Sequence, residues 1–441
     1  MNEEKKDKKT KPIIGITIGD INGVPRGKVI ESASLDESEL QHLAAAVLVQ
    51  TIDGHYAQCM DTLNAQDHDM LLQPDWSSYR QTPWAENTAQ VICHTINKES
   101  GKPITYDSRN VLKKIIAEYS ELGLSAVVAP ELEFYLLEPP AKNCIQLEPA
   151  VGEREWAEFG GEAFSPDALR KYQPFVDDLK LYCQQANLDT NAIVHEMGPA
   201  QVELNVEHGE VLDRADQLFM LKRLVKACAQ KHGKLASFMA KPLANLPGNG
   251  LHVHCSMLNA QGQNVFALDD GKAGLQLQQF IAGLQVYLPT AFALVAPNVN
   301  SYKRFVRGVS APINLAWGYD NRTTGLREPF GDDKAGRVEN RIAGADVDPY
   351  LIMAVTLGCG LLGLQKQLTP TESFDGDAYN EEADLPSNLE AALSSLCASE
   401  ELRKLFGNDF VDAFISCKQG ELNHMAATIS PWEARYLGSM L

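Results

Sequence analysis

The stretch VVAPELEFYLLEP (residues 127–139) has the composition of a buried β-strand, yet it carries two acids in its middle. Its aliphatic and aromatic residues are typical of a sheet core, whereas Glu131 and Glu133 are not. Successive strand side chains alternate between two faces, so these carboxylates share one face about 7 Å apart. Two like charges on an apolar strand are costly unless a cation lies between them. The strand therefore predicts a positively charged partner.

The length and composition of the chain indicate a large globular protein. Its 441 residues suffice for two or three domains, and 44% of them are hydrophobic. No apolar run reaches transmembrane length, and no apolar segment of a secretory signal follows the charged start. We expect residues 1–12 to form a solvated tail of a cytoplasmic protein that does not bind membranes. The nine cysteines include no CxxC pair, which favours reduced thiols.

The net charge of −19 excludes some classes of partner. It argues against a nucleic-acid-binding surface and against binding to an anionic membrane. A cationic substrate would suit this charge, although many acidic enzymes have no such substrate. Charge alone therefore narrows the class of ligand without choosing it.

Turn residues and hydrophobic periodicity predict short strands separated by helices and loops. Residues 12–30 have the pattern of a β-hairpin, and residues 36–48 that of an apolar helix. Residues 51–84 show little periodicity, which predicts long irregular structure. Asp107 has the position of an N-cap for a helix that ends at Gly123. We place a domain boundary near residue 106, because the irregular composition ends there.

The second part of the chain follows the same pattern. Further strands are expected at 127–139, 201–207, 251–258 and 337–344, and helices at 165–187, 215–233, 274–295, 348–368 and over the last 70 residues. Strands and helices do not alternate regularly, so we expect an α+β fold and not a βαβ array.

Three further predicted strands carry functional groups on one face. They are QVELNVE with Glu203, Asn205 and Glu207, LHVHC with His252 and His254, and RVENR with Arg337, Glu339 and Arg341. A solvated face would explain any one of them, but such faces usually carry Lys, Thr, Ser and Gln. Carboxylates and imidazoles bind Mg²⁺ or Mn²⁺, and Arg binds phosphate and carboxylate. With Glu196 of VHEMG, the set predicts a multi-metal site for phosphoryl transfer.

A basic segment, residues 301–331, lies within this acidic chain. Its cations are Lys303, Arg304, Arg307, Arg322 and Arg327. Taken alone, the segment is explained as well by a surface loop with scattered arginines. Beside the glutamate-bearing strands, it favours binding of an anion, since guanidiniums stabilise the charge of a moving phosphoryl group.

The segment KPLANLPGNGLHVHCS (241–256) resembles the ATP-region signature of the glutamine synthetase superfamily. PELEFYL, HEMGPAQVE, NRTTGLR and RVENR occur in that family's order and roughly its spacing, so the resemblance covers about residues 12–441. It implies a small N-terminal β-grasp domain over 13–106 and, over 107–441, a catalytic domain that binds ATP and glutamate. That domain would have a funnel of antiparallel strands flanked by helices. It also implies a homo-oligomer, commonly a dodecamer of two hexameric rings, with active sites shared between subunits.

The resemblance also implies a role for each functional residue. One metal would be held by Glu133, Glu196 and Glu203 and a second by Glu131, His252 and Glu339, with two or three Mg²⁺ or Mn²⁺ ions per site. ATP would lie near His254 and Ser256, with its phosphates bound by Arg322, Arg327 and Arg337. Glutamate would contact Gly248, with Arg304 at its α-carboxylate, Arg341 at its γ-carboxylate, and Arg322 and His252 nearby. The catalytic set would be Arg322, Arg327, Arg341 and Glu339.

The chemistry implied by the resemblance has two steps. ATP phosphorylates the γ-carboxylate of glutamate, because a carboxylate is too poor an electrophile to be attacked directly. An amine then displaces phosphate from γ-glutamyl phosphate. Metals and arginines stabilise the first transfer, and the second requires a group that takes a proton from the amine.

The chain departs from glutamine synthetases proper where that family binds ammonium. Asp53 and Gly54 are followed by His55 and Tyr56 in place of two serines, and Ser310 precedes the Ala-Pro pair in place of a flap glutamate. We predict an amine site at Asp53 and Ser310. Loss of the flap carboxylate opens space, so a bulkier amine is expected, as in the γ-glutamylpolyamine synthetases that act in amine catabolism on substrates such as putrescine. The alternatives are a glutamine synthetase that uses ammonium, a ligase for another monoamine, and a catalytically silent structural member.

Overall fold

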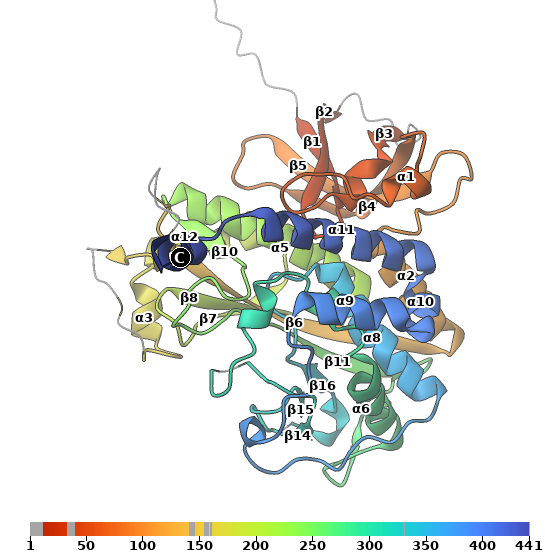
Figure 1. The fold of residues 1–441 in the computed structure, drawn as a ribbon. Helices are drawn as coiled ribbons and strands as arrows, with labels where there is room; N and C mark the ends of the chain where they lie inside the picture. Colours follow the sequence, from red (N-terminus) through yellow and green to blue (C-terminus); the bar gives the residue numbers. More distant parts are fainter. Residues whose placement is uncertain are drawn as a thin grey trace, which may run out of the picture.

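The fold contains two main β-sheets with helices between and around them (Figure 1). The structure is a computed structural model that describes residues 12–32, 40–140, 146–153, 158, 161–309, 311–329 and 331–440. This mixture of a smaller N-terminal sheet and a larger mixed sheet confirms the α+β class. Within the described ranges, no helix is both long enough and apolar enough to cross a membrane.

The N-terminal sheet has five strands in the order β2-β1-β5-β4-β3. The strands are β1 (Ile13–Gly19), β2 (Pro25–Glu31), β3 (Gln41–Ala44), β4 (Asp69–Gln81) and β5 (Thr88–Asn97). β1 and β5 are parallel, and the other neighbours are antiparallel. The predicted hairpin is confirmed, and Asp20 stabilises its turn by accepting hydrogen bonds from the backbone N–H groups of Asn22 and Val24, both at 2.9 Å.

Two expectations for the N-terminal part are wrong. The helix expected over residues 36–48 is replaced, from residue 41 onward, by β3 and a 3₁₀ turn, η2 (Ala45–Val49); residues 33–39 lie outside the described ranges. The irregular region expected over 51–84 contains the short helix α1 (Met60–Leu63) and the 13-residue strand β4. Met70 and Leu72 are buried at alternate positions of β4, but the Asp, Gln and Trp residues around them obscure this period-two signal.

The larger sheet is built around β6 (Leu124–Leu137), which pairs with β11 on one side and with β8 on the other. The nine strands follow the order β14-β15-β16-β11-β6-β8-β7, and β9 and β10 also pair with β6. The remaining strands are β7 (Thr190–His195), β8 (Gln201–Val206), β9 (Gly209–Glu210), β10 (Leu235–Ser237), β11 (Leu251–Asn259), β14 (Trp317–Tyr319), β15 (Leu326–Glu328) and β16 (Val338–Asn340). A separate hairpin joins β12 (Leu268–Asp269) to β13 (Lys272–Ala273). Strands are confirmed at all four predicted places in this region, although the one expected over 337–344 is limited to Val338–Asn340.

The helices pack on the sheets, and the N-cap at Asp107 is where the sequence predicts it. They are α2 (Ser108–Glu121), α3 (Pro166–Arg170), α4 (Gln173–Gln185), α5 (Val211–Lys231), α6 (Leu275–Tyr287), α7 (Phe292–Val295), α8 (Pro349–Gln365), α9 (Leu389–Ala398), α10 (Glu400–Phe406), α11 (Asn408–Ala427) and α12 (Pro431–Met440). The Asp107 side chain accepts from the Arg109 N–H at the start of α2, as expected of an N-cap. The single helix expected over 165–187 is instead two helices, α3 and α4, and the one expected over 274–295 is likewise two, α6 and α7. Packing of α2 and α5 on β6 leaves the opposite face of that strand to Glu131 and Glu133.

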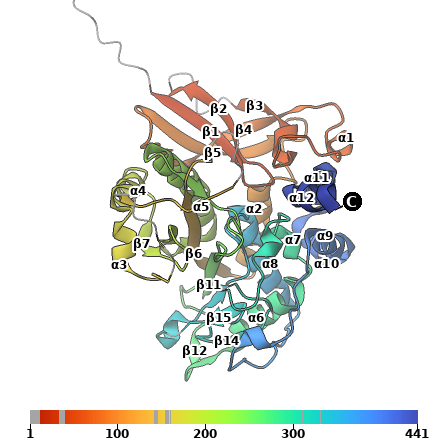
Figure 2. The same ribbon diagram turned by 60° about the vertical axis from the view of Figure 1, so that its left-hand side comes forward.

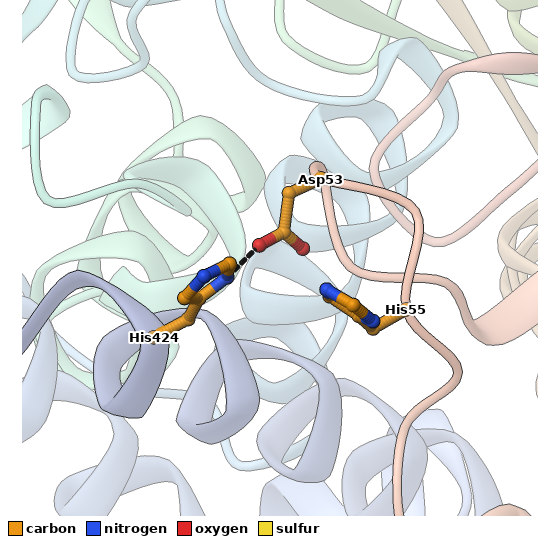
Figure 3. A group of neighbouring side chains, drawn as sticks. All are labelled: Asp53, His55 and His424. Atoms are coloured by element: carbon orange, nitrogen blue, oxygen red, sulfur yellow. Dashed lines mark hydrogen bonds and ion pairs between the residues drawn. The ribbon is translucent and has the colours of Figure 1, made fainter. Parts of the chain in front are cut away.

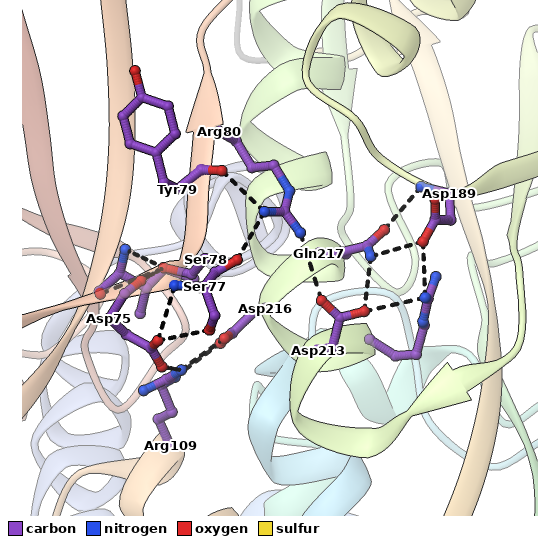
Figure 4. A network of polar contacts seen from close by, with 12 residues as sticks. Asp75, Ser77, Ser78, Tyr79, Arg80, Arg109, Asp189, Asp213, Asp216 and Gln217 are labelled. Atoms are coloured by element: carbon purple, nitrogen blue, oxygen red, sulfur yellow. Dashed lines mark hydrogen bonds and ion pairs between the residues drawn. The ribbon is translucent and has the colours of Figure 1, made fainter.

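A buried ion-pair network joins the N-terminal sheet to the helices of the larger part (Figure 4). Arg109 on α2 donates to Asp75 on β4 at 2.6 Å and to both carboxylate oxygens of Asp216 on α5 at 2.8 and 2.7 Å. The Tyr350 hydroxyl of α8 also donates to Asp216, at 2.8 Å. This network spans the expected boundary near residue 106, and the division into two domains there remains a prediction.

The long helix α11, the last but one in the chain, lies beneath the N-terminal sheet in both views (Figures 1 and 2). The backbone N–H of Cys59 donates to the Ser416 hydroxyl at 3.0 Å, and that of Ile52 donates to Glu421 at 2.8 Å. The loop after η2 is therefore anchored to a helix that is distant in the sequence.

Candidate active site

The strand register brings the predicted ligands opposite one another on adjacent strands. The directly opposed pairs are Glu131 with His252, Glu133 with Glu203, and His254 with Glu339. These residues come from β6, β8, β11 and β16, which are neighbours in the sheet. Since opposed side chains project to the same face, the acids and imidazoles found on four separate stretches of sequence share one surface.

Glu131 lies at the centre of this group. Its carboxylate oxygens are 3.3 Å from His252 Nδ1 and 3.0 Å from His254 Nε2. Candidate ligand atoms of Glu131, Glu203 and His252 lie within 4.8 Å of one another, and so do those of Glu131, His254 and Glu339. The structure thus forms two groups that share Glu131, whereas the resemblance assigns Glu203 to a metal with Glu133. The division of ligands between two metals remains a prediction.

The neighbouring carboxylates change one another's pKa values. Burial, together with Glu131 and Glu133, raises the pKa of Glu203 to about 9, and burial with Glu133 raises that of Glu196 to about 7. Burial also acts to raise the pKa of Glu131, but hydrogen bonds from both imidazoles outweigh it and lower that pKa. Negative charge therefore exceeds positive charge around Glu203. This donor set fits a divalent cation with oxygen and imidazole ligands.

The glycine-rich turn before β11 allows a close approach to this group. The Gly250 N–H donates to Glu133 at 2.7 Å, and a Cβ atom at Gly250 would lie 2.8 Å from His252 Nε2 and 2.9 Å from Arg304 Nη2. At Gly248 a Cβ atom would lie 2.4 Å from the Ala240 carbonyl oxygen. Any side chain at Gly250 would fill the space between Glu133, His252 and Arg304.

Three arginines of the predicted set surround Glu339 and its neighbours. Arg327 Nη1 donates to Glu339 at 2.8 Å, and Arg341 Nη1 donates to its other oxygen at 2.5 Å. Although burial acts to raise the pKa of Glu339, Arg341 and His252 lower it to about 2. Arg304 is almost fully buried and donates to the Ile342 carbonyl at 2.7 Å. Glu339 is therefore held ionised, with guanidiniums on one side and imidazoles on the other.

Three of the residues expected near ATP line one cavity of about 580 Å³. His254, Ser256 and Arg337 lie in its wall together with Glu131 and Asn205. Within the part of the chain that the structure describes, His254 Nδ1 and Asn205 Oδ1 are buried without a hydrogen-bond partner. Unpaired buried polar atoms beside an open cavity favour a polar ligand there.

Three predicted residues are not assembled into this group. Arg322 is exposed in the loop before β15 and makes no hydrogen bond or ion pair with other described residues. Asp53 lines a different cavity, where it pairs with His424 of α11 (Figure 3). Ser310 lies outside the described ranges. The amine site at Asp53 and Ser310 therefore stays a prediction.

The site also contains residues that no sequence motif marks. Gln201 donates to Glu133 at 3.3 Å and to the Gly248 carbonyl at 2.9 Å, and so links β8 to the glycine-rich turn. Asp320 forms an ion pair with Arg327. Both contacts depend on how loops fold back on the sheet, and neither residue carries a local sequence signal for its position.

Known proteins resemble the chain over nearly its whole length. Residues 105–437 match the family model described as glutamine synthetase, catalytic domain. The chain is 34% identical to gamma-glutamylputrescine synthetase PuuA of Escherichia coli (strain K12), covering 96% of this chain and 91% of that protein. It is 33% identical to a glutamate–isopropylamine ligase of Pseudomonas sp., covering 95% and 93%. A solved structure of GmaS without ligand superposes with a TM-score of 0.84 at 28% identity, covering 97% of this chain and 96% of that one.

Proposed function

Because the chain belongs to the glutamine synthetase family, we propose that it joins the γ-carboxyl group of glutamate to an amino group of a polyamine such as putrescine, with ATP as the energy source. The broader activity, an ATP-dependent glutamate–amine ligase, agrees with the names of its relatives. The observation that carries the proposal is the convergence of Glu131, His252 and Glu339, with further carboxylates, on one face of the sheet. This surface has the donors that a phosphorylating site requires.

In the first proposed step, a γ-carboxylate oxygen of glutamate attacks the γ-phosphorus of ATP and ADP leaves. Arg304 and Arg341 would bind and orient the two carboxylates of glutamate. Arg322, Arg327 and Arg337 would bind the phosphates, while His254 and Ser256 would contact the nucleotide. The buried positions of Arg304 and Arg341 support this role, because charges on a fixed guanidinium need no reorganisation as charge develops.

The acidic face of the sheet supports binding of Mg²⁺ or Mn²⁺. We propose that Glu133, Glu196 and Glu203 hold one ion and that Glu131, His252 and Glu339 hold a second. A bound divalent cation neutralises phosphate charge and polarises the phosphorus–oxygen bond. Burial and the neighbouring carboxylates of Glu131 and Glu133 raise the pKa of Glu203, which supports this assignment because a cation there would offset their charge.

In the second proposed step, a deprotonated amine attacks the carbonyl carbon of γ-glutamyl phosphate and inorganic phosphate leaves. We propose that Asp53 binds the ammonium form of the amine and that Ser310 leaves room for a chain longer than ammonia. Since Asp53 lines another cavity in its own chain, this role requires a neighbouring subunit. The family's dodecamer of two hexameric rings, working in the cytoplasm where ATP and glutamate are available, is the assembly that we propose.

An amine panel tests the proposal. Purified protein with ATP, Mg²⁺ and glutamate is assayed for phosphate release with ammonium, putrescine, spermidine, isopropylamine and ethanolamine. We expect the highest kcat/KM with putrescine or spermidine. Ammonium as the best substrate would make the protein a glutamine synthetase, and isopropylamine would make it a monoamine ligase. An assembled protein that binds nucleotide but turns over no amine would be a silent structural member.

A further inference from the structure

A second cluster of metal-ligating side chains lies apart from the acidic face of the large sheet. Asp53 and His55 of the loop after η2 meet His424 of α11, although Asp53 and His424 are 371 positions apart in the chain (Figure 3). The three residues line a cavity of about 520 Å³. Their ligand atoms all lie within 4.8 Å of one another. We propose that Asp53, His55 and His424 bind a divalent transition-metal ion, Zn²⁺ in the first instance.

The loop that carries two of these ligands is held in place by its own hydrogen bonds. Thr51 Oγ1 donates to Asp53 Oδ1 at 2.5 Å and accepts from the His55 N–H at 2.9 Å. The Ile52 N–H donates to Glu421 of α11 at 2.8 Å, which fixes the loop against the helix that carries His424. The ligands are therefore positioned before any ion binds, so less conformational entropy is lost on binding.

The donor set distinguishes this cluster from the catalytic one. Two imidazoles and one carboxylate suit Zn²⁺, whereas Mg²⁺ prefers oxygen ligands and keeps most of its waters. The side chains of Asp53 and His424 are 33% and 55% exposed, so water can complete the coordination shell. The rings of His55 and His424 lie 5.5 Å apart at 69°, so both can face an ion beside Asp53 without stacking on each other.

A bound ion would crosslink two distant parts of the chain. It would tie the loop at Asp53 to α11 and so add a bond between the N-terminal region and the C-terminal helices. It would also occupy the carboxylate of Asp53. If Asp53 serves the amine, as the proposed function has it, Zn²⁺ would then lower turnover by blocking that carboxylate.

Zinc counting tests the site directly. The full-length protein, wild type and His424→Gln, is dialysed against Zn²⁺ in excess Mg²⁺, and zinc per subunit is measured by elemental mass spectrometry. We expect His424→Gln, and separately His55→Gln, to bind one zinc less than wild type. The control is His68→Gln, which removes another exposed histidine, 2.9 Å from Glu99, and should leave the zinc content unchanged. Equal zinc in wild type and His424→Gln would overturn the proposal.

Crystals soaked in Zn²⁺ locate the ion independently of the count. We expect an anomalous peak at the zinc edge between Asp53, His55 and His424, and its absence would also overturn the proposal. Zinc inhibition of amine turnover is measured separately in wild type and in His424→Gln. Loss of one zinc without relief of inhibition would leave the metal site standing and would contradict only the role of Asp53 in amine binding.

Discussion

Glu339 and Arg341 lie two residues apart at the end of β16, and Arg341 Nη1 donates to Glu339 Oε1 at 2.5 Å. Arg327 donates to the second carboxylate oxygen at 2.8 Å, while His252 Nδ1 lies 3.7 Å from the first. A single buried carboxylate is therefore shared between the guanidinium groups and the imidazole side of the site. Substitution there should affect the chemistry before it affects the fold.

We expect Glu339→Ala to abolish ATP-dependent phosphate release. The change removes a proposed metal ligand and leaves two guanidiniums without their shared partner, so kcat should fall by at least about a hundredfold. Size-exclusion chromatography should show an unchanged assembly. The matched control is Glu372→Ala, at an exposed position, which should keep full activity. Survival of activity in Glu339→Ala would refute the metal assignment.

Gly250→Ala should impair catalysis through crowding. The new Cβ atom would lie 2.8 Å from His252 Nε2 and 2.9 Å from Arg304 Nη2, so both side chains must move. We expect kcat to fall by about ten- to a hundredfold, because displacements of about 1 Å in a site have effects of this size. In Gly438→Ala, the control, the added atom meets nothing within 4 Å and kcat should not change. Steady-state kinetics with a saturating amine measures both.

Arg109→Met should destabilise the protein without touching the active site. It removes the cation that pairs with Asp75 and Asp216 and leaves a buried carboxylate unpaired, at a cost of about 3–5 kcal/mol. Urea denaturation followed by circular dichroism measures the loss. Arg170→Met breaks an ion pair with Asp167 in which both side chains are largely exposed, and should change stability by less than about 0.5 kcal/mol. Equal effects of the two substitutions would contradict the role given to burial.

Ionisation of Asp348 should lower the free energy of unfolding as the pH rises. Burial raises its pKa from 3.8 to about 7, so the folded protein holds this proton more tightly than the unfolded chain. Stability from this group is thus greatest below about pH 4, declines as pH rises towards 7, and then levels off. Each pKa unit corresponds to about 1.4 kcal/mol, which bounds the loss at about 4 kcal/mol.

Asp348→Asn isolates this contribution. In the wild type, the Tyr350 N–H donates to the Asp348 carboxylate at 2.7 Å and so caps α8. The amide oxygen of the substituted side chain can accept the same hydrogen bond, so the N-cap of α8 is kept. We expect the difference in Tm between pH 5 and pH 8 to be smaller in Asp348→Asn than in wild type. If the variant had the same pH dependence as wild type, the pKa of Asp348 would not be raised in the folded protein, and the prediction would be wrong.

The parts of the fold that could be predicted carry strong local signals. The strand at Glu131 and the helix capped by Asp107 are marked by apolar runs and by a capping residue, which act over a few neighbours in sequence. The hairpin turn at Asp20 is marked in the same way. The candidate ligands could be predicted as well, since Glu and His on alternate strand positions face one side whatever the partner strands are.

What could not be predicted depends on contacts between distant segments. The apolar spacing of β3 fits both a helix and a strand, and only pairing with β4 decides between the two. No sequence pattern marks His424, because it becomes a candidate ligand only where α11 meets the loop at Asp53. The grouping of Glu203 with Glu131 and His252 follows from side-chain geometry that strand alternation does not specify.

The 14-residue strand β6 can accept substitutions of its apolar residues but not a change in its length. Glu131 and Glu133 owe their common face to position parity, and all their cross-strand partners depend on the same register. Insertion or deletion of one residue upstream of them within β6 would turn both carboxylates into the helix-packed core at once. Length variation among relatives should therefore collect in the loops around β6, while the strand itself keeps its length even where its apolar residues change.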